Sequence, residues 1–262
     1  MKGVSLLIAL VLLITVTACD KINPEKKEGA RQKTVVVLCD LSESTRNVRR
    51  TYLDAFKNVV SSLNHGDVIV VAKITESSAT EPDIPVNEEI PEFVPRDKFG
   101  KVIDNEMLVR KAKEEADKIL NKKKELLIKR VEEFIIPRRN DRRKIMRTDI
   151  MSSLRVAEKF FRNYRRDKAI LVLLSDMVED SRSYNFEREH LSDRRIQQII
   201  TNERNKNLLP DLRGVKVYVV AAGVKGSKKF FELQKFWLKY FKECGASSAE
   251  ENYSSVLIRF EE

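Results

Sequence analysis

Short apolar runs alternate with segments of helical periodicity along most of this chain. Continuous apolar runs rich in β-branched residues predict buried strands at 34–39, 68–74, 169–174, 215–222 and 256–260. Apolar residues at helical spacing predict helices at 48–63, 151–161, 194–205 and 228–242. Unbroken apolar strands that alternate with helices are typical of a doubly wound, mostly parallel α/β sheet with helices on both faces. We expect residues 34–262 to form one such domain.

Residues 77–147 interrupt this rhythm and predict an insertion of a different kind. The segment 81–95 holds four prolines and five acidic residues, which indicates an extended acidic loop with a short edge strand around Phe93. Residues 105–136 are dense in Lys and Glu and carry apolar residues at helical spacing, which predicts an amphipathic helix of about 45 Å ended by Pro137. Two interpretations stay open: the helix packs on the domain through its apolar stripe, or it offers a face to a partner.

The amino terminus has the pattern of an export signal. Lys2 precedes an apolar run at 4–16 and the small residues before Cys19, which predicts a signal peptide over 1–18 that is too short to span a membrane. The stretch 16–19 resembles a bacterial lipobox, which implies lipid on Cys19, although a plain secretory signal is the alternative. Residues 19–33 are then a polar tether. The chain is expected to be exported and anchored to the cell membrane, on the periplasmic face of the inner membrane in a Gram-negative cell.

The charge balance is basic, with 50 Lys and Arg against 40 Asp and Glu and a net charge of +10. Such a balance favours acidic partners, anionic lipid or nucleic acid. Basic residues gather in two clusters, Arg138, Arg139, Arg142, Arg143, Lys144 and Arg147, and Arg162, Arg165, Arg166 and Lys168. No aromatic platform or known binding motif accompanies them, so a solvated or lipid-facing surface is the favoured interpretation and nucleic-acid binding the rival.

A candidate metal motif follows the first predicted strand. Asp40 comes directly after the apolar run, and Ser42 and Ser44 follow at alternate positions. Carboxylate and hydroxyl oxygens are hard donors that suit Mg²⁺, Mn²⁺ or Ca²⁺. Where a buried strand runs into a helix, these three side chains can surround one divalent cation.

This motif resembles the first metal-binding motif of the von Willebrand factor A domain. The resemblance implies a threonine on a later loop, matched by Thr148, and an aspartate after a later core strand, matched by Asp176. The glycine that commonly follows this aspartate is replaced by Met177. The resemblance covers roughly 34–74 and 147–260, and it implies the doubly wound fold predicted above.

The resemblance also implies a mechanism of binding rather than catalysis. The hydroxyls of Ser42, Ser44 and Thr148 would touch the cation, Mg²⁺ as first expectation, while Asp40 and Asp176 would act largely through water. A coordination position left open would attract an acidic residue of a protein partner.

Purely structural roles and a rival enzymatic interpretation remain open for these residues. Each hydroxyl or carboxylate taken singly could cap a helix or a turn. A magnesium-dependent phosphatase of the haloacid dehalogenase type also places an aspartate after its first strand, but it needs a second aspartate where Ser42 stands. The chain shows neither a nucleophile elbow nor a phosphate-binding glycine loop. A non-enzymatic binding module is therefore the leading expectation.

Overall fold

Six strands form one sheet in the order β3-β2-β1-β4-β5-β6. The computed structural model describes residues 31–76, 78–136, 147–257 and 260. Within them the strands are β1 (Lys33–Asp40), β2 (Val68–Ile74), β3 (Asp83–Glu89), β4 (Lys168–Leu174), β5 (Val215–Val220) and β6 (Tyr253–Ser254). Only β3 runs antiparallel to its neighbour. The prediction of a mostly parallel α/β sheet is confirmed.

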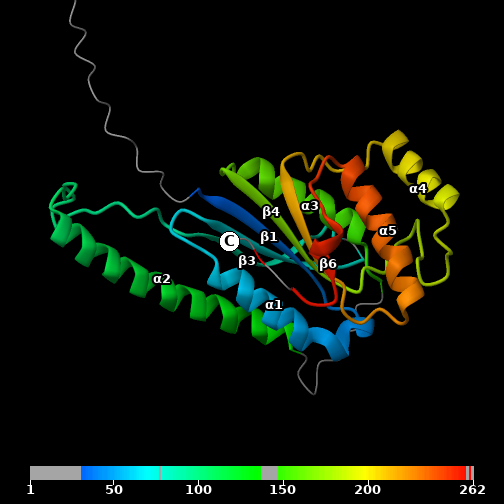
Figure 1. The fold of residues 1–262 in the computed structure, drawn as a ribbon, viewed down its shortest axis with the longest axis horizontal. Coiled ribbons are helices and arrows are strands. Elements are labelled where there is room, and N and C mark those ends of the chain that lie inside the picture. The colour runs from blue at the N-terminus through cyan, green and yellow to red at the C-terminus, as the bar shows by residue number, and fades with distance from the viewer. Residues whose placement is uncertain (1–30, 77, 137–146, 258–259, 261–262) are drawn as a thin grey trace, which may run out of the picture. The chain divides into compact units, whose positions relative to one another are not determined.

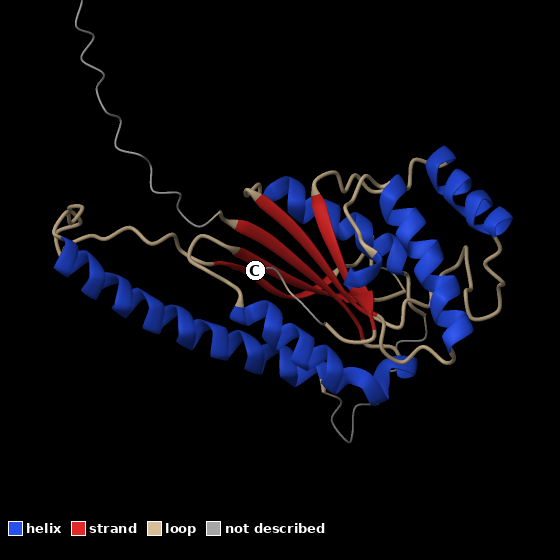
Figure 2. Cartoon of the chain, in the orientation of Figure 1, coloured by secondary structure: helices blue, strands red, loops and turns tan. Residues whose placement is uncertain are grey.

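Helices cover both faces of this sheet (Figure 2). They are α1 (Arg49–Ser61), α2 (Glu106–Ile135), α3 (Ile150–Asn163), α4 (Asp193–Asn205) and α5 (Ser227–Glu243), with short 3₁₀ helices η1 (Glu43–Val48) and η2 (Glu250–Asn252). Alternate residues of β1 point to opposite faces, so Val35 and Val37 join a core with α1 and α2, while Val36 and Leu38 join a core with α3, α4 and α5. Residues from Arg31 onward form a compact unit that contains both cores.

Two edge strands differ from their predicted positions. The acidic segment does supply an edge strand, but it is β3, whereas Phe93 lies beyond it with its ring 5.9 Å from that of His65. Pro85 is tolerated in β3 because β3 has a neighbour on one side only. The last strand of the described residues is β6; of the predicted strand at 256–260, residues 256, 257 and 260 are not in a strand, and 258 and 259 lie outside the described residues.

The long helix of the predicted insertion begins and ends as its sequence indicates. Asn105 caps α2 by accepting hydrogen bonds from the N–H groups of Met107 and Leu108 at 3.1 and 3.2 Å. The second half of the helix packs on α1 and the sheet through buried Leu120, Leu127, Val131 and Ile135. The expectation of packing through an apolar stripe thus describes this half, and no residue of α2 before Leu120 is buried.

The strand order reverses between β1 and β4, and this point positions the candidate site. From β1 the chain proceeds to β2 on one side, and from β4 to β5 on the other (Figure 1). In such sheets the loops at the carboxyl ends of the two central strands diverge and leave a crevice for ligands. Asp40 ends β1 and Asp176 follows β4 by two residues, so both belong to these loops.

Candidate metal centre

Asp40 is held rigidly at the end of β1. Its carboxylate accepts a hydrogen bond from the N–H of Ser42 at 2.8 Å and another from the hydroxyl of Ser175 at 2.8 Å. The parallel register places Cys39 beside Leu174, which brings the residues that follow them, Asp40 at the end of β1 and Ser175 just after β4, to the same level. Asp40 is fully buried, so these bonds fix both carboxylate oxygens.

The two serines and the second aspartate continue this hydrogen-bonded chain. The hydroxyls of Ser42 and Ser44 lie 2.9 Å apart, and the Ser44 hydroxyl is close enough to the Asp176 carboxylate to lower its pKa. Asp176 also accepts from the N–H of Val178 at 3.1 Å. Asp176 is 4% exposed whereas Ser44 is exposed, so the group opens to solvent at Ser44. Four of the five residues expected around a cation are therefore brought together.

The fifth residue, Thr148, lies beside the same loop without joining the chain of bonds. It precedes α3 and is 5% exposed. Its backbone forms an antiparallel bridge with Asp180, with N···O distances of 3.0 and 2.9 Å. Asp180 follows Asp176 by four residues, so Thr148 is fixed to the β4–α4 loop. Among the described residues, no hydrogen bond joins the Thr148 hydroxyl to the other four.

The electrostatics of the site favour a bound positive charge. Burial raises the pKa of Asp40, and burial together with the negative charge of Asp40 raises the pKa of Asp176 to about 7. Arg49 lowers the pKa of Asp40 only in part, and its guanidinium donates to the backbone oxygens of Leu41 and Ser42. Two neighbouring buried carboxyl groups are ionised together only when a cation compensates them.

The donor set fits a divalent cation by its chemistry. Two carboxylates and two hydroxyls converge, and all are hard oxygen donors. No group of three or more His, Cys, Asp or Glu side chains that could hold a metal occurs in the described residues. A cation held here would therefore need the serine hydroxyls as ligands beside the two carboxylates.

Met177 adopts the backbone conformation that glycine takes most easily. Its φ is 61°, in the left-handed region, and its side chain is fully buried. The N–H of Met177 donates to the Ser175 hydroxyl at 2.9 Å, and its carbonyl accepts from Nε1 of Trp237 at 2.8 Å. The replacement of glycine therefore keeps a left-handed turn directly after Asp176, with some backbone strain.

Sequence reasoning missed two residues of this site. One is Ser175, which links Asp40 to the loop of Asp176; its signal was a hydroxyl directly after the strand. The other is Glu179, which is fully buried and accepts from the N–H groups of Ile150 and Met151 at 2.8 and 3.1 Å. Burial, and to a lesser degree the charge of Asp149, raises the pKa of Glu179. Glu179 thus joins the β4–α4 loop to the first turn of α3.

Several other predicted features lie outside this site. Cys19 and the basic residues at 138–144 are outside the described residues, and Arg147 is exposed. In the second basic cluster, Arg162 pairs with Glu158 at 3.1 Å and Arg166 pairs with Glu89, so part of its charge is neutralised.

The remaining cysteines and the aromatic face of α5 are structural. Cys39 and Cys244 are buried thiols without a disulfide. Phe236, Trp237 and Tyr240 are fully buried, as expected for core residues. Among the described helices, none combines the length and the apolar character that a membrane span requires.

Comparisons with known proteins show only distant structural likeness. No family model and no curated protein matches the chain. A von Willebrand factor type A protein from Catenulispora acidiphila aligns at 16% identity and TM-score 0.35, over 82% of this chain and 43% of that one. The PilB minor pilin of Streptococcus sanguinis aligns at 12% identity and TM-score 0.44, over 85% and 58%.

An aerotolerance-related membrane protein from Bacteroides fragilis aligns at 11% identity and TM-score 0.30, over 71% of this chain and 65% of that one. The chain spans less than two thirds of the length of each of these three structures. Similarity at this level assigns neither a family nor an activity.

Proposed function

We propose that this chain is a lipid-anchored protein-binding module of the von Willebrand factor A type, which captures a partner carboxylate through a divalent cation. The observation that carries the proposal is the gathering of Asp40, Ser42, Ser44 and Asp176 at the point where the strand order reverses, with Asp40, Ser42 and Ser44 joined by hydrogen bonds. Thr148 is the fifth proposed ligand. The cation, Mg²⁺ as the first expectation, would supply the positive charge that attracts an acidic residue of the partner.

The protein groups favour binding over hydrolysis. Asp40 is fully buried with a hydrogen bond on each carboxylate oxygen, which leaves it poorly placed to attack a substrate. Ser42 occupies the position at which a phosphatase would need its acid–base aspartate. The exposed hydroxyl of Ser44 instead lies where a ligand from outside can approach.

Cation binding is tested by thermal melting of residues 31–262 with Mg²⁺, Mn²⁺ and Ca²⁺. A cation that binds only the folded chain stabilises it by about 2.7 kcal/mol at a hundredfold excess over Kd. We expect the rise in melting temperature to disappear in Asp40→Asn, which keeps a hydrogen-bonding side chain but removes the charge. A wild-type chain that melts at the same temperature with and without all three cations would contradict the proposal.

Carboxylate capture is tested with a pair of peptides, one containing Asp and its counterpart containing Asn. The Asp peptide is expected to bind only when the cation is present, and Thr148→Ala is expected to abolish that binding. Equal binding of both peptides would remove the carboxylate from the mechanism while leaving the cation site intact.

Lipid anchoring needs its own measurement because it concerns Cys19 alone. Cys19→Ser is expected to release the protein from membranes in cell fractionation. A variant that stays with the membrane fraction in high salt would show that Cys19 is not the anchor.

A further inference from the structure

A projecting arm carries ordered structure without a buried core. No residue in 91–119 is buried. Arg96 and Val102 form an antiparallel bridge around a turn in which Asp97 accepts from the N–H groups of Phe99 and Lys101, both at 2.9 Å. The first half of α2 follows. We define the arm as residues 91–119; local hydrogen bonds shape its outer part, and contacts with His65 connect its inner part to the rest of the protein.

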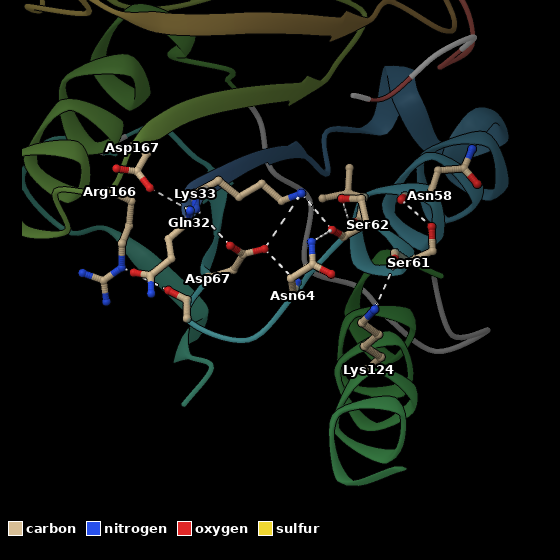
Figure 3. A network of polar contacts seen from close by, with 12 residues as sticks. Gln32, Lys33, Asn58, Ser61, Ser62, Asn64, Asp67, Lys124, Arg166 and Asp167 are labelled. Atoms are coloured by element: carbon tan, nitrogen blue, oxygen red, sulfur yellow. Dashed lines mark hydrogen bonds and ion pairs between the residues drawn. The ribbon is translucent and has the colours of Figure 1, made fainter. Parts of the chain in front are cut away.

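The arm extends from the edge of the sheet at which β1 begins. At that edge Lys33 donates its N–H to Asp67 at 2.9 Å and its Nζ to the carbonyl of Ser62 at 2.7 Å (Figure 3). Helix α2 is tied to the same edge, because Lys124 donates to the carbonyl of Ser61 at 2.9 Å.

Nearest the start of α2, the described contact between this helix and the rest of the protein is made by Asp117, whose Oδ1 lies 3.0 Å from Nε2 of His65. Residues 106–116 of α2 therefore run about 17 Å past the edge. Figure 1 shows this end of α2 near the end of the sheet at which β1 begins, whereas the loop that leads from β1 into α1 lies at the other end of the strands.

The outer end of the arm concentrates exposed apolar side chains. We define the tip as residues 94–113. Nine large apolar side chains are exposed among the described residues, and five of them lie in the tip: Val94, Phe99, Val102, Met107 and Leu108. Phe99 is 82% exposed, the largest value of the nine. Such a gathering on a monomer is typical of a contact surface.

The tip is also basic. Between 94 and 113 it contains six basic residues against three acidic ones, a net charge of +3: Arg96, Lys98, Lys101, Arg110, Lys111 and Lys113 against Asp97, Asp104 and Glu106. Glu114 and Glu115 follow directly, and Nε of Arg110 lies 4.0 Å from Glu114, so the uncompensated basic residues are those nearer the turn at Asp97 and on the first turns of α2. Asp97 serves the turn, and Glu106 lies in the first turn of α2, where a negative charge stabilises the helix. Nζ of Lys98 lies 5.0 Å from the centre of the Phe99 ring, so a positive charge and an aromatic side chain occur side by side.

We propose that the tip rests on an anionic lipid surface, with Phe99 and Leu108 entering the interface and the basic side chains facing the headgroups. Aromatic and aliphatic side chains flanked by Lys and Arg are the combination that such interfaces bind. The orientation of the domain on the membrane rests on the proposed function, in which lipid is attached to Cys19. Cys19 precedes Arg31 by 12 residues, a span of at most about 40 Å, so the end of the sheet at which β1 begins would stay near the membrane. The arm would then hold the carboxyl edge of the sheet, with its cation site, away from the lipid.

The test is co-sedimentation of residues 31–262 with vesicles, which removes any contribution from lipid on Cys19. EDTA is present throughout, so the result is independent of the cation site and distinguishes failure of this inference from failure of the proposed function. Vesicles of phosphatidylglycerol and phosphatidylcholine, one to two, are compared with phosphatidylcholine alone. We expect binding to the anionic vesicles and about a tenfold weaker partition for Phe99→Ser and for Leu108→Ser.

Phe231→Ser is the matched control, because Phe231 is 61% exposed on α5 and lies outside the arm. It should bind vesicles as the wild type does. The inference is overturned if the wild type does not bind anionic vesicles, or if all three variants bind equally. It is also overturned if sedimentation velocity without lipid shows a dimer that Phe99→Ser dissociates, because the tip would then pair with a second copy.

Discussion

The carbonyl of Met177 accepts a hydrogen bond from the indole Nε1 of Trp237 at 2.8 Å. This contact joins α5 to the turn directly after Asp176, and both residues are fully buried. Because the left-handed conformation of Met177 is intrinsically unfavourable, its surroundings must hold it in place. The position of the Asp176 carboxylate therefore depends on a side chain that is distant in sequence.

Trp237→Phe removes the donor and leaves a buried carbonyl unpaired. We expect the free energy of unfolding, measured with urea, to fall by about 1–3 kcal/mol, and we expect the cation to bind more weakly. Tyr240→Phe is the control, since the Tyr240 hydroxyl is buried with no hydrogen-bond partner in the described residues. Its removal should leave stability unchanged or raise it, because it takes away a buried polar group that has no partner. A Trp237→Phe variant with wild-type cation affinity would show that the contact does not support the site.

Met177→Gly and Met177→Ala separate backbone strain from side-chain packing. Both lose a fully buried side chain, so both should be less stable than the wild type by about 2–5 kcal/mol before strain is considered. Only glycine adopts the positive φ without strain, so we expect the free energy of unfolding of the glycine variant to be about 1 kcal/mol higher than that of the alanine variant. Thermal or urea unfolding decides the order. An alanine variant that is the more stable of the two would be inconsistent with a left-handed residue 177.

Glu179 tests how the loop after β4 is tied to α3. Since its pKa is raised by burial, the neutral acid is favoured, and Glu179→Gln should keep an acceptor for the N–H groups of Ile150 and Met151. We expect Glu179→Gln to lower the free energy of unfolding less than Glu179→Ala does, and the alanine variant to lose about 1–3 kcal/mol. If Gln proves as costly as Ala, the site requires an ionised carboxylate at this position.

The pKa of Asp176 predicts how pH acts on the site. Its value of about 7 lies above its ordinary value of 3.8, so between about pH 4 and pH 7 the folded cation-free chain holds more protons than the unfolded chain. Stability without cation should then fall as pH rises through this window.

A cation must displace the same proton, so its affinity should weaken by up to about tenfold per pH unit below pH 7. Titrations at pH 6 and pH 8 check this. Asp193→Asn should leave the dependence unchanged, because hydrogen bonds from Lys235 and Lys239 lower the pKa of Asp193 to about 2. Equal cation affinity at both pH values in the wild type would show that Asp176 carries no proton that the cation must displace.

The sequence predicts the central part of the fold well, for a physical reason. Strands β1, β2 and β4 are buried on both faces, so their apolar runs have sharp ends, and the predicted bounds of β2 agree with the structure. The edge strands are harder to place. One side of β3 and β6 is unpaired, so polar residues and prolines are tolerated there and the apolar pattern is weaker.

The site was predictable only as far as its residues lie at the ends of strands. Asp40 and Asp176 could be placed on adjacent loops because each follows an apolar run. The bonds from Ser175 to Asp40 and from Trp237 to Met177 link residues 135 and 60 positions apart, and no local pattern encodes them. Glu179 was missed because its partners are backbone N–H groups, which leave no mark in a sequence.

The most direct test of the central claim is a titration with Mn²⁺ in which the free ion is followed by electron paramagnetic resonance. We compare the wild type, a Ser42→Ala/Ser44→Ala double variant, and Ser61→Ala, which alters an exposed serine of α1 far from the two central loops. The account predicts one saturable site per chain in the wild type and in Ser61→Ala, with affinity at least about tenfold weaker in the double variant. Equal affinity in all three proteins, or no saturable site in the wild type, would contradict it.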